Sequence, residues 1–159
     1  NFIRTDLNHA YNDPEIDFTI VIMHLPMYSS GDGDSFMDMR NELQPIFDLY
    51  GVDLVLNGHR HAYERTYPVM FNNIVTDNDD CLYDDPDGQI YLTVGTGGHS
   101  HNKFKQKQSW SVVQNHNDFG FFAHTLFEFD IFLYFSHFVY VLSIIYSKQI
   151  PCLFIARER

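Results

Sequence analysis

Two histidines, His59 and His61, stand one residue apart directly after Gly58, in the run "NGHRHAYERTYP". Residues i and i+2 of an extended segment project to the same side of the chain, so both imidazoles can face one volume. Neutral imidazole is the commonest nitrogen ligand for divalent transition metals. The pair therefore predicts a metal site, with both rings on one ion or one ring on each ion of a two-metal centre.

The elements on either side of this pair bring in a third histidine, His24. The runs Asp17–Met23 and Val52–Asn57 are short, apolar and rich in β-branched residues, which predicts two strands buried on both faces. A crossover helix between them implies parallel strands, so the loops that carry the histidines open at one sheet edge, where α/β sheets bind ligands. The pair alone also fits ordinary hydrogen-bonded histidines, but three histidines at one edge favour a metal site.

The segment Ser35–Tyr50 is the predicted crossover helix of this α/β fold, because its apolar residues recur at helical spacing. Pro45 inside it should kink the helix or break it into two pieces. Upstream, a loop rich in glycine and proline places Asp34 or Ser35 to cap the helix. Downstream, the acidic insert Thr76–Gly88 is typical of a solvated loop.

A third strand is predicted over Gln89–Gly98, and its glycines allow close approach of the backbone to a ligand or a neighbour. His99 and His101 follow it as a second His-x-His pair and as a rival metal site. We favour a surface role for this pair, because loops flanked by glycine make poorly fixed ligands.

Composition limits the classes of partner. The chain has 159 residues with 45% hydrophobic residues, enough for one domain, and its formal net charge of -11 disfavours binding to nucleic acid or to anionic membranes. Cys81 and Cys152 cannot define a disulfide framework. No Asn-x-Ser/Thr site is present, and we expect Asn1 to be an interior residue of a longer protein.

Tyr63, Glu64 and Arg65 directly follow the histidine pair. Either Tyr63 or Glu64 orients the histidines through hydrogen bonds, or Glu64 and Arg65 form a local ion pair that fixes the loop, and we favour the ion pair. Met27 and Tyr28 are expected to shape the rim of the pocket or to pack under it.

The motifs resemble those of one known family. "MHLPMYSS" at 23–30 and "VDLVLNGHRHAYERTYPV" at 52–69 are similar to the last two metal-binding motifs of the purple acid phosphatases, within the calcineurin-like metallophosphoesterases. "YLTVGTGG" at 91–98 resembles the strand end that follows them, and the similarity extends in weaker form to 119–130. The resemblance implies that residues 1–130 form the carboxyl-terminal part of the catalytic domain, a β-sandwich flanked by helices.

The resemblance also implies an activity, the hydrolysis of small phosphate monoesters at a bimetallic centre of Fe(III) with Zn, Mn or Fe(II). His24 and His59 would ligate the divalent ion and His61 the ferric ion, with Asn57 and Gly58 beside the ligands. The family suggests a secreted, lysosomal or vacuolar compartment and leaves the oligomeric state open.

Two departures from the family pattern limit this expectation. The earlier motifs, which supply a bridging carboxylate, an asparagine and a tyrosinate, do not precede His24. Where plant-type members carry a histidine, this chain has Asp32 and Asp34. Three neutral histidines cannot hold Fe(III), which prefers anionic oxygen ligands, so we expect this chain alone to be inactive. The alternatives are another calcineurin-like phosphodiesterase or nucleotidase, or a non-catalytic fragment with an incomplete metal site.

The tail 131–159 departs as well, because its segment 131–147 contains no charged residue. As a helix, 17 residues reach only about 25 Å, short of a hydrocarbon core of about 30 Å. A membrane anchor is therefore the least favoured reading. A buried strand or translated non-native sequence fits better.

Overall fold

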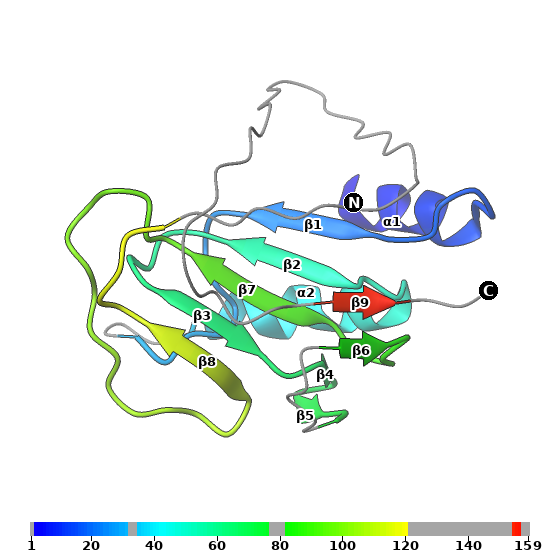
Figure 1. Ribbon diagram of the computed structural model, residues 1–159. Coiled ribbons are helices and arrows are strands. Elements are labelled where there is room, and N and C mark those ends of the chain that lie inside the picture. The colour runs from blue at the N-terminus through cyan, green and yellow to red at the C-terminus, as the bar shows by residue number, and fades with distance from the viewer. Residues whose placement is uncertain (1, 32–34, 77–81, 121–153, 157–159) are drawn as a thin grey trace.

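The computed structural model describes residues 2–31, 35–76, 82–120 and 154–156, and a five-stranded mixed sheet forms its centre (Figure 1). The strand order is β1-β2-β7-β3-β8. These strands span Ile20–Met23 (β1), Leu54–Asn57 (β2), Ile90–Val94 (β7), Tyr63–Thr66 (β3) and Ser111–Asn115 (β8). The predicted α/β class is confirmed.

Three neighbouring strands of this sheet run parallel. Met23 at the end of β1 pairs with Asn57 at the end of β2, and Asn57 pairs with Thr93 in β7. The loops that follow these strands therefore leave the sheet at one edge, as the sequence predicts. Strands β3 and β8 add antiparallel pairs, so the chain returns to that edge at the start of β3.

Helix α2 (Met37–Leu49) covers one face of the sheet and lies behind it in Figure 1. Ile46 and Phe47 of this helix belong to one hydrophobic cluster with Val55 of β2 and Tyr91 of β7. Helix α1 (Phe2–Asn12), which the sequence pattern does not predict, adds Leu7 to the same cluster. The cluster anchors β2, which carries the histidine pair at its end.

One expectation about these elements is wrong, and another is narrowed. Strand β1 is not buried on both faces, since Ile22 is 62% exposed whereas Val55 of β2 is fully buried. The reason is that β1 is the outermost strand of the sheet, while β2 has a neighbouring strand on each side. Of the kink or break predicted at Pro45, the break is excluded, because helix α2 continues through this residue to Leu49. Proline removes one backbone donor, and the packing of Ile46 and Phe47 keeps the helix in place.

Smaller elements lie beside the main sheet. They are the β4 (Val69–Met70) and β5 (Asn73–Ile74) hairpin and the parallel pair of β6 (Leu82–Asp84) with β9 (Phe154–Ala156). Tyr83 of β6 is buried, so the acidic insert is only partly a solvated loop. Within the described residues, no helix has the length and apolar character needed to cross a membrane. The predicted division at residue 130 and the tail segment 131–147 lie outside those residues.

Candidate metal centre

His24 and His59 face each other at the edge of the sheet. His24 Nε2 lies 3.1 Å from His59 Nδ1, and the two rings are nearly perpendicular, with an interplanar angle of 81°. Two imidazole lone pairs at this distance repel each other unless a proton or a cation lies between them. With metal–nitrogen bonds of about 2.0–2.1 Å, a separation of 3.1 Å corresponds to a ligand angle of about 100°, between octahedral and tetrahedral values. The pair therefore fits one shared divalent ion, as well as an N–H···N hydrogen bond.

The backbone of His24 is held by the next strand. The amide Nδ2 of Asn57 donates to the carbonyls of Met23 at 3.3 Å and Leu25 at 3.1 Å, and the N–H of Gly58 donates to the carbonyl of His24 at 3.1 Å. Asn57 and Gly58 thereby bind three consecutive carbonyls around His24. They fix this loop relative to His59, which follows Gly58 directly.

His59 occupies a tight turn with φ of 63°, in the left-handed region that non-glycine residues rarely adopt. Backbone bonds from Arg60 N to Gly58 O and from Ala62 N to Arg60 O close the turn at 2.7 and 2.8 Å. Desolvation lowers the pKa of His59 below the ordinary histidine value, and the nearby Arg60, His24 and His61 lower it further. The neutral form, which is the form that binds metals, is thereby favoured.

Gly95 explains how the third strand reaches this turn. A Cβ atom at Gly95 would lie 1.7 Å from the carbonyl oxygen of Arg60, so only glycine fits. Its N–H donates to the carbonyl of Ala62 at 3.0 Å. The predicted close approach of a glycine to a neighbour is confirmed at Gly95, whereas a Cβ atom added at Gly97 would meet nothing within 4 Å.

His61 lies beside a different partner from His59. Its Nδ1 is 3.0 Å from the carbonyl of Ser100, which can only accept, so Nδ1 carries the proton and Nε2 keeps the lone pair. Asn102 binds the His61 backbone on both sides, accepting from its N–H at 2.8 Å and donating to its carbonyl at 2.9 Å. A carbonyl bonded to the second ring nitrogen is the usual way that proteins orient a metal-binding histidine.

His99 packs its ring against His61, with centroids 4.4 Å apart. The structure thus brings this exposed loop histidine next to a predicted ligand, while His101 packs against Phe119 instead. Nowhere in the described part of the chain do three His, Cys, Asp or Glu side chains form a group that could hold one ion. The histidines form two separate pairs, His24 with His59 and His61 with His99.

Glu64 and Arg65 bind different partners rather than each other. Glu64 is 2% exposed and accepts from Ser30 N at 2.8 Å, Ser111 Oγ at 2.8 Å and Gln114 Nε2 at 3.0 Å. Arg65 is 1% exposed and donates to the hydroxyl of Tyr83. The expectation of an ion pair between Glu64 and Arg65 is wrong, because adjacent residues of a strand project to opposite faces. Glu64 instead joins the loop after His24 to β8.

Tyr28 and Tyr63 are buried in the core. Tyr28 belongs to the hydrophobic cluster of the core. Its hydroxyl lies 2.7 Å from Gln44 Oε1 and 2.9 Å from Asn72 Oδ1, and the guanidinium of Arg40 lies 3.8 Å above its ring. Burial raises the pKa of Tyr28 to about 12, although Arg40 opposes the shift, and burial also raises the pKa of Tyr63. Asp32 and Asp34 lie outside the described residues.

The sequence pattern does not predict three contacts of the site. The Ser100 carbonyl and Asn102 hold His61, and the ring of Phe36 meets His59 edge-on with centroids 5.4 Å apart. A backbone carbonyl has no side-chain signal, and Phe36 follows the apolar spacing of Ser35–Tyr50, which indicates a buried helix face rather than a contact with the site. Asn102 is one residue from the second His-x-His pair, which was the only available hint.

Comparison with known proteins supplies relatives for this arrangement. Residues 3–63 match the family described as Calcineurin-like phosphoesterase. Acid phosphatase type 7 of zebrafish (Danio rerio) is 30% identical over 141 residues, covering 76% of this chain and 32% of the relative. Probable inactive purple acid phosphatase 1 of Arabidopsis thaliana is 34% identical over 91 residues, covering 56% and 14%. The structure of purple acid phosphatase PPD1 from yellow lupin (Lupinus luteus) superposes with a TM-score of 0.69 at 32% identity, covering 76% of this chain and 22% of that chain. The chain therefore spans about a third or less of each of these proteins.

Proposed function

We propose that this chain, which carries part of a calcineurin-like phosphoesterase domain related to the purple acid phosphatases, supplies histidine ligands to a bimetallic centre that hydrolyses phosphate monoesters. The single observation that supports the proposal most is the 3.1 Å separation between His24 Nε2 and His59 Nδ1. Buried polar side chains normally form hydrogen bonds in which a donor faces an acceptor. Here two nitrogens converge at an exposed edge, in the arrangement that two ligands of one cation require.

His24 and His59 would hold the divalent ion, Zn, Mn or Fe(II), and His61 would bind the second ion, Fe(III), through Nε2. When bound, two cations attract phosphate oxygens and lower the pKa of water, so that hydroxide is available near neutral pH. The residues of this chain hold the rings in position, and the lowered pKa of His59 favours the neutral form of that ring. The hydrogen bond between His61 Nδ1 and Ser100 O fixes its tautomer, and Asn57 fixes the His24 loop.

The ligands available besides the histidines decide whether this chain can hold both ions. A hard trivalent ion prefers anionic oxygen ligands, and in the described part of the chain no carboxylate joins His61 in a metal-binding group. This supports a second candidate, a non-catalytic protein in which the motif persists without a complete centre. We therefore expect the purified chain to hydrolyse p-nitrophenyl phosphate no faster than the buffer does.

Zinc binding by the purified chain, measured by isothermal titration calorimetry, tests the proposal. We expect His24→Ala and His59→Ala each to weaken zinc binding at least about 10-fold, because each removes one of two ligands to the same ion. His9→Ala is the matched control, since His9 is exposed on α1, away from the histidine pairs. Zinc affinity that is unchanged in both site variants would contradict the proposal.

A further inference from the structure

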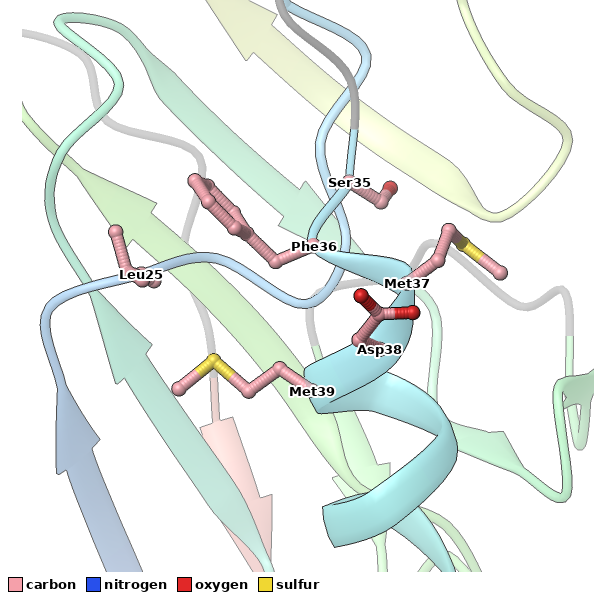
Figure 2. A pocket seen from close by; sticks show the side chains of 6 residues that line it. All are labelled: Leu25, Ser35, Phe36, Met37, Asp38 and Met39. Atoms are coloured by element: carbon pink, nitrogen blue, oxygen red, sulfur yellow. The ribbon is translucent and has the colours of Figure 1, made fainter.

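An open pocket of about 350 Å³ lies at the first turn of α2 (Figure 2). It is lined by Leu25, Ser35, Phe36, Met37, Asp38 and Met39. In Figure 2 the side chains of Leu25, Phe36 and Met39 extend to one side of this turn, while Met37 extends to the other. Four of the six lining side chains are apolar, although the pocket is open to solvent and Met37 is 48% exposed.

The pocket lies beside the His24–His59 pair, because two of its lining residues adjoin these histidines. Leu25 directly follows His24 in the chain. The ring of Phe36 meets the His59 ring edge-on at a centroid distance of 5.4 Å, and the guanidinium of Arg60 lies 5.5 Å from the Phe36 centroid. The N–H of Phe36 donates to the carbonyl of Pro26 at 3.1 Å, which fixes this wall to the His24 loop. A phosphate at the histidine pair would therefore have apolar surface beside it.

The size and charge of the pocket define what it can accept. A volume of 350 Å³ is near the small end of the range of about 300–1,000 Å³ for small-molecule sites, so it suits one aromatic ring rather than a polymer. The edge of an aromatic ring packs well on Phe36, and flexible methionines adapt to its outline. Asp38 is the one charged group in the lining, and it repels a second anionic group.

We propose that this pocket binds the aryl group of a phosphate monoester whose phosphate lies at His24 and His59, and that Asp38 disfavours substrates with a second anionic group. The inference rests on the proposed function, since it places the phosphate at the histidine pair. It goes further by assigning a substrate class: single-ring aryl phosphates rather than bisphosphates or nucleoside polyphosphates.

Two phosphonates, which cannot be hydrolysed, test the pocket without relying on activity. The zinc-loaded chain is titrated with phenylphosphonate and with methylphosphonate by calorimetry. We expect phenylphosphonate to bind about 10-fold more tightly, since burial of an aromatic ring in an apolar site adds roughly 1.4 kcal/mol or more. Phe36→Ala should reduce this preference below about 3-fold. Met39→Ala should also reduce it, and Met39 makes no ring contact with His59. Phe2→Ala, which removes an aromatic residue that is 75% exposed on α1, should leave it unchanged.

A further variant tests whether Asp38 disfavours a second anionic group. Asp38→Asn should improve binding of 4-carboxyphenylphosphonate at least about 3-fold while leaving phenylphosphonate unchanged, because only the first ligand carries a second anion. Equal binding of phenylphosphonate and methylphosphonate by the unmodified chain would not affect the proposed function, and it would overturn the proposal that the pocket binds an aryl group. Absence of binding by either phosphonate would overturn it too, and the zinc titration then shows whether the histidine pair failed with it.

Discussion

Within the described residues, two groups of polar side chains differ in the partners that satisfy their hydrogen bonds. In the polar interior, formed by Tyr28, Arg40, Glu64 and Arg65, each side chain binds another protein group. At the histidine edge, formed by His24, His59, His61 and His99, the rings lie at the exposed ends of strands, and two ring nitrogens face each other at 3.1 Å.

The difference teaches that clustered polar residues need not share a role. A buried carboxylate with three donors has its hydrogen-bonding capacity used within the protein, and it contributes to stability. Converging imidazole nitrogens at an exposed edge retain capacity for a ligand. Changes in the polar interior should therefore alter the free energy of unfolding, and changes at the histidine edge should alter metal affinity.

The largest expected effect is at Gly95, which packs against the turn of the histidine edge. Gly95→Ala places a Cβ atom 1.7 Å from the Arg60 carbonyl oxygen, so the turn that carries His59 must move. We expect a loss of about 3 kcal/mol in the free energy of unfolding, measured by urea denaturation, together with weaker zinc binding. Gly97→Ala is the control, because nothing lies within 4 Å of that position, and equal losses in both variants would refute the steric argument.

Glu64→Gln should change stability without removing a histidine. All three partners of Glu64 donate hydrogen bonds, and glutamine has only one oxygen. Its amide nitrogen must face either the Ser30 N–H, which can only donate, or Ser111 and Gln114, which must then reorient in order to accept. The expected loss in the free energy of unfolding is about 2 kcal/mol by urea denaturation. An exposed carboxylate, changed by Glu42→Gln on α2, is the matched control. A stability equal to that of the unmodified chain would show that the three bonds contribute little.

Asn57→Asp should lower metal affinity by loosening the loop that carries His24. Asn57 Nδ2 donates to the Met23 and Leu25 carbonyls, and a carboxylate of the same shape would repel both. Because residues that orient a ligand typically contribute 10–100-fold to metal affinity, we expect zinc binding to weaken about 10-fold. The exposed Asn73→Asp is the control for added charge. An unchanged zinc affinity would mean that Asn57 does not position His24.

The smallest expected effect is confined to alkaline pH. The unfolded chain loses the Tyr28 proton near pH 10, whereas the folded chain keeps it up to about pH 12, so between these values the unfolded state binds fewer protons and stability falls as pH rises. The expected slope from this residue is about 1.4 kcal/mol per pH unit. Urea denaturation at pH 9, 10 and 11 should show a steeper decline in the unmodified chain than in Tyr28→Phe. The exposed Tyr11→Phe is the control, and equal slopes in the unmodified chain and Tyr28→Phe would contradict the assignment.

The sequence by itself determined the α/β class, the parallel order of the first two strands and the sheet edge at which the histidines gather. These follow from local rules, because hydrophobic periodicity defines the elements and a crossover helix makes strands parallel. It also predicted that a glycine would allow close approach. It did not predict which glycine, since neither Gly95 nor Gly97 carries a side chain that indicates its neighbours.

Only the tertiary structure decided the pairing of side chains. It gave Glu64 and Arg65 different partners and placed His99 against His61. It also showed that β1 is the outermost strand of the sheet, with Ile22 exposed. These outcomes depend on contacts between residues far apart in the chain, such as Glu64 with Ser111 and His61 with Ser100. Sequence spacing specifies the direction of a side chain along its own element, and the packing of other elements determines what it meets there.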